Sequence, residues 1–139
     1  MDANKLNIGD SYSFNRLITE QDIIIFSEVS GDKNPIHLDN DYAKESIFKE
    51  RIAHGFLIGS LISAAIGQHL PGNGTIYLSQ SMRFKAPVKI NDIITVTIEV
   101  VDFPKVNRVT LKTTCKNQTG LIVIEGEALV IPPPLLSIK

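Results

Sequence analysis

The stretch SGDKNPIH, residues 30–37, places a carboxylate and an imidazole, Asp32 and His37, five positions apart in a stiff loop. Pro35 fixes its own φ and moves Asn34 out of the helical region, so the stretch cannot form one continuous helix. Even on a helix, five residues would turn the two side chains about 140° apart. They can converge only where the loop bends, and the short amide of Asn34 can hold such a bend by bonding to nearby backbone.

A carboxylate and an imidazole that face one another can share a water molecule, one group taking its proton while the other handles a second proton. The residue types also allow a structural interpretation, in which Asp32 and Asn34 are turn residues and His37 is a partly buried histidine with satisfied hydrogen bonds. Loops between helices often contain Gly, Asp, Asn and Pro. Spacing by itself therefore leaves both interpretations open.

Length and composition predict one domain over residues 1–139. Hydrophobic residues make up 43% and charged residues 21% of the chain, as is typical of soluble globular proteins. With 14 basic and 15 acidic residues the formal net charge is −1, which predicts no nucleic-acid or anionic-membrane partner. The longest apolar stretch is shorter than the roughly 20 residues of a membrane-spanning helix, and MDANKLNIGD carries no apolar signal segment. We therefore expect a cytoplasmic protein.

Cys115 is the single cysteine, so an internal disulfide is excluded and a cysteine-based zinc site has too few ligands. It lies in the strand-like run RVTLKTTCKNQ, where a small buried thiol is the usual role. We interpret it as structural.

Short helices are predicted on both sides of the loop. Thr19 and Asp22 have the pattern of a helix amino terminus, and Gly31 ends that helix. Asp39 or Asn40 can cap a second short helix after the loop.

A third helix, from Gly55 to about Leu70, carries no charge other than possibly His69, and a helix that is apolar on all sides is a buried one. Period-two patterns predict a strand over residues 10–18 and four or five further antiparallel strands after Gly74, the first of them in TIYLSQSMRFKAPV. One long antiparallel sheet curled around one apolar helix is an α+β arrangement.

Two segments, SGDKNPIHLDNDYAKES and AHGFLIGSLISAAIGQHLPGNGTIYLSQSMRFKAPV, resemble the MaoC-like, or hydratase 2, family of (R)-specific enoyl-CoA hydratases. The family pattern G-D-x-N-P-x-H, followed by alanine or serine, is filled by Gly31, Asp32, Asn34, Pro35, His37 and Ala43. The resemblance covers most of residues 17–130. It implies a hotdog fold, in which an antiparallel sheet wraps around a long apolar central helix, and for a single copy of this size it implies a homodimer.

The resemblance also implies the chemistry. Asp32 and His37 would be the catalytic residues, which activate one water for addition to a trans-2-enoyl-CoA and give an (R)-3-hydroxyacyl-CoA. Asn34 and Ser63 would support this pair, although Ser63 could instead be a small packing residue bonded to its own helix. Gly55 would bind the thioester oxygen, because backbone N–H groups at a helix start are unpaired and glycine permits close approach; a simple helix-start glycine is the alternative.

No metal and no redox cofactor is expected, since coenzyme A is part of the substrate. The pattern of His37, Asp39 and Asp41 could suggest a metal site, but carboxylates that cap helices explain it better. The alternatives to a hydratase are a 3-hydroxyacyl-ACP dehydratase and a non-catalytic acyl-thioester binding module. A pure binder gains little from burying two titratable groups, which argues against the module. The sequence does not fix the acyl-chain length, the carrier or the pathway, of which polyhydroxyalkanoate synthesis and fatty acid metabolism are examples.

Overall fold

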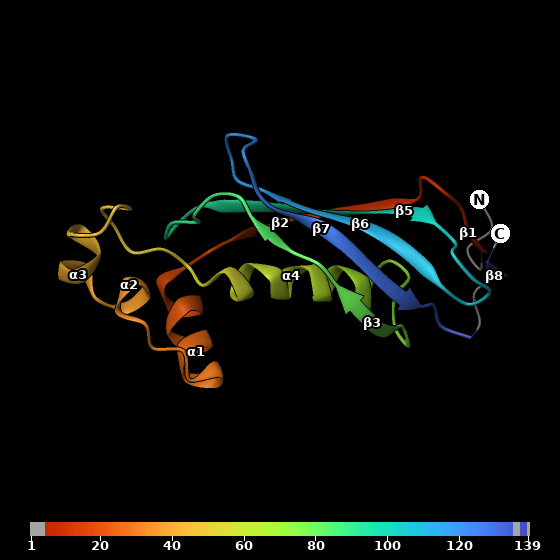
Figure 1. Cartoon of the computed structure of the whole chain (residues 1–139), viewed down its shortest axis with the longest axis horizontal. Coiled ribbons are helices and arrows are strands. Elements are labelled where there is room, and N and C mark those ends of the chain that lie inside the picture. Colours follow the sequence, from red (N-terminus) through yellow and green to blue (C-terminus); the bar gives the residue numbers. More distant parts are fainter. Residues whose placement is uncertain (1–4, 135–136, 139) are drawn as a thin grey trace.

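The computed structural model of the protein describes residues 5–134 and 137–138, and its main element is a six-stranded antiparallel sheet (Figure 1). The strand order is β2-β5-β6-β7-β3, with β4 also pairing with β7. The strands are β2 (Ser11–Leu17), β3 (Ile76–Gln80), β4 (Arg83–Phe84), β5 (Ile93–Asp102), β6 (Val109–Lys116) and β7 (Ile122–Ile131). Two short strands, β1 (Lys5–Leu6) and β8 (Ser137–Ile138), pair in parallel apart from this sheet.

Helix α4 (Gly55–Gln68) runs along one face of the sheet and builds the core with it (Figure 1). Alternate residues of β5 point inward, as period two requires, and are fully buried: Ile94, Val96, Ile98 and Val100. They belong to one cluster with the buried face of the helix: Leu57, Ile58, Leu61, Ile62, Ala65 and Ile66. This is the predicted α+β hotdog architecture.

The prediction that α4 is buried on all sides is wrong for a single chain. Phe56 is 65% exposed, and Ser63 and Ala64 are also exposed, because the sheet covers only one side of the helix. The face of α4 that points away from the sheet is therefore part of the surface of a single chain.

The helices α1 (Glu20–Ser30), α2 (Pro35–Leu38) and α3 (Asn40–Lys44) gather beside the amino-terminal end of α4 (Figure 1). The predicted start of α1 is confirmed as a capping box between Thr19 and Asp22, and Gly31 ends the helix with a left-handed φ of 78°. Asp39 caps α3, accepting the N–H groups of its first turn. Helix α2 was not predicted; Pro35 occupies its first turn.

The predicted strand TIYLSQSMRFKAPV is split into β3 and β4. Gly126 of β7 lies so close to this segment that a Cβ there would be 1.9 Å from the carbonyl oxygen of Ser81. The backbone crossing at Ser81 interrupts the regular ladder, and the register of β3 on β7 also shifts between Tyr77 and Ser79.

The Cys115 side chain is fully buried, and burial raises the pKa of its thiol to about 12, which supports the structural interpretation. None of the helices in the described residues has the length and apolar character needed to cross a membrane.

Candidate active site

The loop after α1 bends through a series of short hydrogen bonds, as its sequence predicts. Ser30 Oγ accepts the N–H of Asp32 at 3.0 Å, and Asp32 Oδ1 accepts the N–H of Asn34 at 3.2 Å. The amide oxygen of Asn34 then accepts the N–H of Ile36 at 3.2 Å and caps α2. Asn34 therefore contributes both backbone and side chain to the bend, and Asp32 is held with one carboxylate oxygen engaged.

His37 lies on α2 with its side chain directed into the protein, and the residue is only 8% exposed. Its Nδ1 is 2.7 Å from the carbonyl oxygen of Ile52. Because a carbonyl can only accept, Nδ1 carries the hydrogen and Nε2 of the neutral ring keeps a free lone pair. Burial lowers the pKa of His37 and the nearby His54 lowers it further, which outweighs the raising effects of the Ile52 carbonyl and of Asp32. The ring therefore offers an unprotonated Nε2 near neutral pH.

The structure brings Asp32 and His37 together and adds a third residue, His54. One side-chain oxygen or nitrogen from each of the three lies within 4.8 Å of the others. Asp32 is exposed, whereas both histidines are buried. The predicted carboxylate and imidazole are therefore close enough to hold a water molecule between them.

The side chain of His54 was not among the site residues predicted from the sequence. Its ring stacks on that of His37 with centroids 3.8 Å apart and planes 26° apart. Its Nε2 lies 3.0 Å from the carbonyl oxygen of Asp32 and 3.1 Å from Ser27 Oγ. The available sequence signal was a histidine directly before the helix-start Gly55.

The same cluster has a geometry that does not favour a metal ion. The ring planes of His37 and His54 are nearly parallel, so their in-plane lone pairs cannot both point at one central ion. One nitrogen of each ring faces a backbone carbonyl oxygen, which leaves the other nitrogen of each ring without such a contact. The absence of a metal at this cluster stays a prediction.

Arg51 is a second residue that the sequence did not single out. It is 7% exposed, and its Nε donates to the carbonyl oxygen of His37 at 2.7 Å. The same guanidinium pairs with Glu20, the first residue of α1, at 2.5 Å. Arg51 therefore ties α2, which carries His37, to the start of α1.

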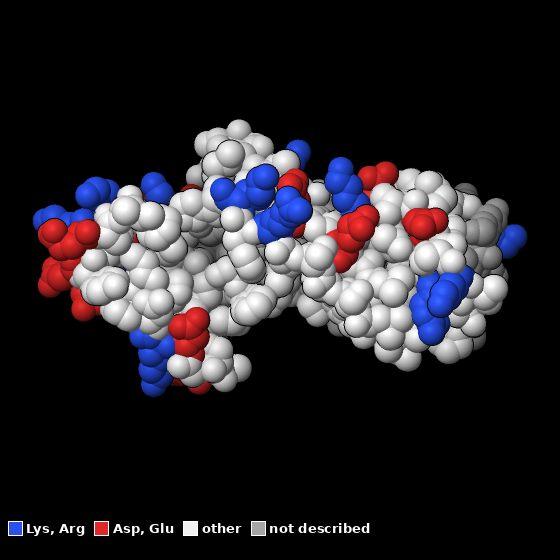
Figure 2. All heavy atoms as spheres, in the orientation of Figure 1, with Lys and Arg blue, Asp and Glu red and all other residues white. Residues whose placement is uncertain are grey.

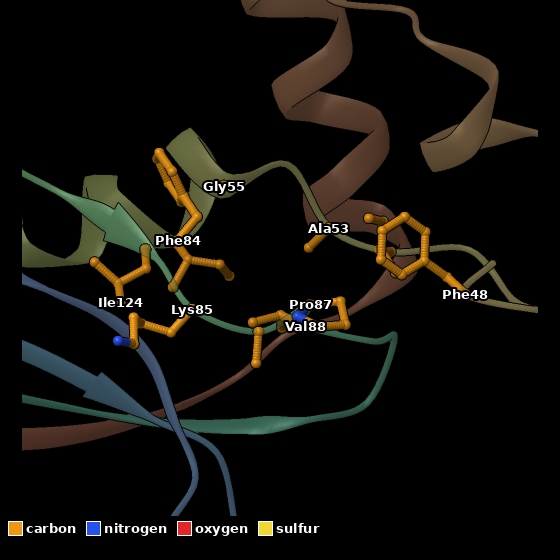
Figure 3. Close-up of a pocket in the computed structure, with 11 residues that line it drawn as sticks. Phe48, Ala53, Gly55, Phe84, Lys85, Pro87, Val88 and Ile124 are labelled. Carbon is orange, nitrogen blue, oxygen red and sulfur yellow. The ribbon is translucent and has the colours of Figure 1, made fainter. Parts of the chain in front are cut away.

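A mostly apolar pocket of about 310 Å³ is lined in part by Ala53 and Gly55, the two neighbours of His54 in the chain (Figure 3). Gly55 forms part of its wall, near Phe84, and Phe48 stands at the opposite end (Figure 3). Ile52, whose carbonyl holds His37, is also a lining residue, whereas Asp32 and His37 are not. The other lining residues are Ile58, Lys85, Ala86, Pro87, Val88 and Ile124.

Gly55 begins α4, as predicted, and the start of this helix has no side-chain cap. Within the described residues no acceptor is bonded to the Gly55 N–H. The N–H groups of a first helical turn lack partners inside the helix and favour negative charge. The pocket therefore adjoins a group that can donate to a ligand oxygen.

Ser63, which the resemblance places beside Asp32, is exposed on α4. Among the described residues no hydrogen bond joins the two, so a role for Ser63 stays a prediction. The nearby Ser60 bonds to the Leu57 carbonyl of its own helix.

The fold and the loop with its paired Asp and His are those that the resemblance to the MaoC-like family implies, and comparison with known proteins agrees. Residues 4–122 match the family described as MaoC like domain, and the chain belongs to this family. The (R)-specific enoyl-CoA hydratase of Rhodospirillum rubrum is 48% identical over 126 residues, covering 90% of this chain and 87% of that protein. The 3-hydroxybutyryl-CoA dehydratase of Methylorubrum extorquens is 42% identical, covering 92% of this chain and 82% of that protein. The solved structure of R-hydratase PhaJ1 from Pseudomonas aeruginosa, without ligand, matches with a TM-score of 0.88 and 49% identity over 92% of this chain and 83% of that one.

Proposed function

We propose that the protein is an (R)-specific enoyl-CoA hydratase, which adds water to a trans-2-enoyl-CoA and forms an (R)-3-hydroxyacyl-CoA. The observation that carries this proposal is the approach of the Asp32 and His37 side chains within 4.8 Å, next to an apolar pocket and an uncapped helix start. The relatives named (R)-specific enoyl-CoA hydratase and 3-hydroxybutyryl-CoA dehydratase support it, since the two names describe opposite directions of one reaction type.

In the proposed reaction His37 Nε2 is the base, because Nδ1 is engaged by the Ile52 carbonyl. Asp32 orients the same water through the carboxylate oxygen that the Asn34 N–H leaves free. The water oxygen bonds to the β-carbon while His37 accepts one proton, and the pair delivers one proton to the α-carbon. One water is consumed, and no electrons are gained or lost.

Negative charge builds on the thioester oxygen as the new bond forms. The Gly55 N–H is the proposed donor to that oxygen, supported by its position at the start of α4 and in the pocket wall. One well-placed donor in a dry site lowers such a barrier by about 3 kcal/mol. The carbon chain or the pantetheine arm of the substrate would then occupy the apolar pocket.

The proposed reaction needs no redox cofactor, because the hydration transfers no electrons, and we propose that it also uses no metal. The stacked geometry of His37 and His54 supports this. Dialysis against EDTA should leave turnover unchanged, and a loss that Zn²⁺ or Mg²⁺ restores would contradict the proposal.

We also propose that the working form is a homodimer. Large apolar side chains are exposed on α4 and on the neighbouring strands: Phe56, Phe84, Ile76, Tyr77 and Leu78. On the face shown in Figure 2, the surface over α4 and β3 is mostly free of charged side chains. Strand β3 is an edge strand, and exposed apolar edges tend to be covered by another chain.

A second copy on this face would also shield the site, whose Asp32 is exposed in one chain. Light scattering should give about twice the 15.3 kDa mass of one chain at micromolar concentration. A mass of one chain under these conditions would contradict the dimer.

The hydratase itself is tested by the loss of enoyl absorbance when the protein is added to crotonyl-CoA. Asp32→Asn and His37→Gln should each lower turnover by about a hundredfold or more while leaving the fold intact. Near-normal turnover in both variants would refute the assignment. Tight binding of crotonyl-CoA without turnover would favour a binding module, and turnover only on an acyl carrier protein thioester would contradict coenzyme A as carrier.

A further inference from the structure

His54 is a buried polar residue that the proposed reaction does not use. It is 2% exposed, and its Nε2 lies 3.0 Å from the carbonyl oxygen of Asp32. Since a carbonyl only accepts, Nε2 must carry the hydrogen, and Ser27 Oγ at 3.1 Å serves as a second acceptor. In the neutral ring Nδ1 is then a bare acceptor, and within the described residues it is buried without a hydrogen-bond partner.

This unsatisfied nitrogen argues against a residue selected for packing alone. A phenyl ring would occupy nearly the same space beside Phe26 and His37 without burying an unpaired acceptor. The feature that a phenyl ring would lack is the Nε2–H, which reaches the backbone of the catalytic loop.

Each of the two stacked histidines donates a hydrogen bond to the backbone of the segment that carries the other. His37, in the loop, donates from Nδ1 to the carbonyl of Ile52, two residues before His54. His54 donates from Nε2 to the carbonyl of Asp32, back in the loop. These reciprocal bonds connect the loop and the segment that leads into α4, and they require opposite tautomers in the two rings.

We propose that His54 is a positioning residue for the hydration: its Nε2–H fixes the backbone of Asp32 and its ring aligns that of His37, so that both catalytic groups face one water. This inference rests on the proposed hydratase function. His54 acts through its neighbours and touches no reacting atom. Its loss therefore lowers kcat through misalignment, with little effect on KM.

The decisive variants separate the ring from its hydrogen bond. His54→Phe keeps the stacking and removes the Nε2–H, and it should lower kcat by about tenfold or more, with KM changed by less than about threefold. His54→Gln restores an N–H donor of similar reach and should regain part of this loss. His54→Phe with kcat within about twofold of the unmodified protein would overturn the proposal.

The matched control is His69, at the other end of α4, which is exposed and stacks on Tyr12 with centroids 4.0 Å apart. His69→Phe replaces the same residue type against an aromatic ring and should leave kcat within about twofold. An equal loss in both variants would show a general effect on the helix and would contradict positioning.

The pH profile gives a readout that a purely structural role would not move. Asp32 and His54 are the titratable groups that face His37, and His54 lowers the pKa of that ring. In His54→Phe the acid limb of kcat/KM should shift to higher pH, and an unshifted limb would count against the proposal.

If the His54 variants do not fold, the proposal is tested by determining the tautomers of the histidines in the unmodified protein. The chain has three histidines, so nitrogen-15 spectra of their rings are simple to assign with His69→Phe. We expect the hydrogen on Nε2 of His54 and on Nδ1 of His37. A hydrogen on Nδ1 of His54 would remove the bond to Asp32 and overturn the proposal whatever the activity. Normal turnover in Asp32→Asn and His37→Gln would instead overturn the hydratase assignment on which the proposal rests, with the hydrogen still on Nε2 of His54.

Discussion

The starts of helices α1 and α4 are built in opposite ways. In α1 the Thr19 hydroxyl accepts the N–H of Asp22 at 3.1 Å, and the Asp22 carboxylate accepts the N–H of Thr19 at 2.9 Å. In α4 the cap residue, His54, makes no such bond and directs its ring to Asp32 instead. The first helix start is satisfied by its own residues, whereas the second keeps N–H groups available beside a pocket. The difference separates a helix start that stabilises the fold from one that can bind a ligand.

Of the changes at the two helix starts, the largest effect is expected from blocking the open start of α4. A Cβ on Gly55 would lie 2.5 Å from the Phe84 ring, so in Gly55→Ala either this ring shifts into the pocket or the thioester is displaced. A misplacement of about 1 Å lowers catalysis by about a hundredfold, and we expect a loss of that order in kcat/KM.

Gly67→Ala is the control, since it lies in the same helix with nothing within 4 Å of its Cβ position. It should leave kcat/KM unchanged and raise the free energy of unfolding by up to about 1 kcal/mol. Equal losses of activity in the two variants would show that Gly55 has no special role.

A second test breaks the link between α2, which carries His37, and the start of α1. Arg51→Met removes the bonds to the His37 carbonyl and to Glu20, while a methionine fills much of the buried space. Losing hydrogen bonds from a buried charged group should lower the free energy of unfolding by about 2 kcal/mol and reduce turnover, as measured by urea unfolding and crotonyl-CoA assay. Glu20→Gln should cost less than about 1 kcal/mol, because the Glu20 side chain is 57% exposed. A larger loss in Glu20→Gln than in Arg51→Met would contradict this account.

The capped start should respond in stability alone. Thr19→Ala removes the hydroxyl that accepts the Asp22 N–H and should lower the free energy of unfolding by about 1 kcal/mol. Turnover of the folded enzyme should not change, because the hydrogen bonds that the structure gives Thr19 go to Asp22 and Ile23 and not to the loop that carries Asp32. A drop in kcat at a temperature well below the unfolding transition would contradict the claim that the start of α1 affects stability alone.

His37, which stacks on the cap residue of α4, and Asp22, in the first turn of α1, should also lose their contributions to stability in different pH ranges. The pKa of His37 is lowered from 6.5, so the unfolded chain binds a proton first and the free energy of unfolding falls as the pH drops below 6.5. Burial raises the pKa of Asp22, but the hydrogen bonds to Thr19 and the pairing with Arg16 outweigh burial, so the pKa is lowered from 3.8. The contribution of Asp22 to the free energy of unfolding is therefore present above pH 3.8 and is lost as the pH falls below it. Urea unfolding across pH 7.5 to 3 should show the first fall disappear in His37→Gln and the second in Asp22→Asn. Unchanged profiles would contradict these assignments.

Local features of the fold were predictable from the sequence. The capping residues Thr19 and Asp39 and the left-handed Gly31 depend on neighbours a few positions away, so their residue types are sufficient to place the helix ends. The same holds for the bend at Asn34, whose bonds span two residues. The α+β class followed from the change of hydrophobic period after about residue 72.

Contacts between distant segments were not predictable in this way. His54 and Asp32 are 22 positions apart, and Arg51 and Glu20 are 31 apart, so their bonds exist only after the chain has packed. The break between β3 and β4 depends on the approach of Gly126 from another strand. The burial of the outward face of α4 was predicted wrongly, because an apolar sequence pattern does not show whether a helix face is covered by its own chain or by another molecule.

The segment that leads into α4, residues 52–53, forms hydrogen bonds with α2 on one side and with Val88 on the other. Ile52 donates its N–H to the Ile36 carbonyl at 3.3 Å and accepts from His37, while Ala53 donates to the Val88 carbonyl at 2.7 Å. For enzyme engineering, this segment is a poor place to alter selectivity, because shifting it displaces both the proposed base, His37, and the pocket wall. Phe48 at the far end of the pocket is the better place to redesign, since a change there leaves these attachments intact.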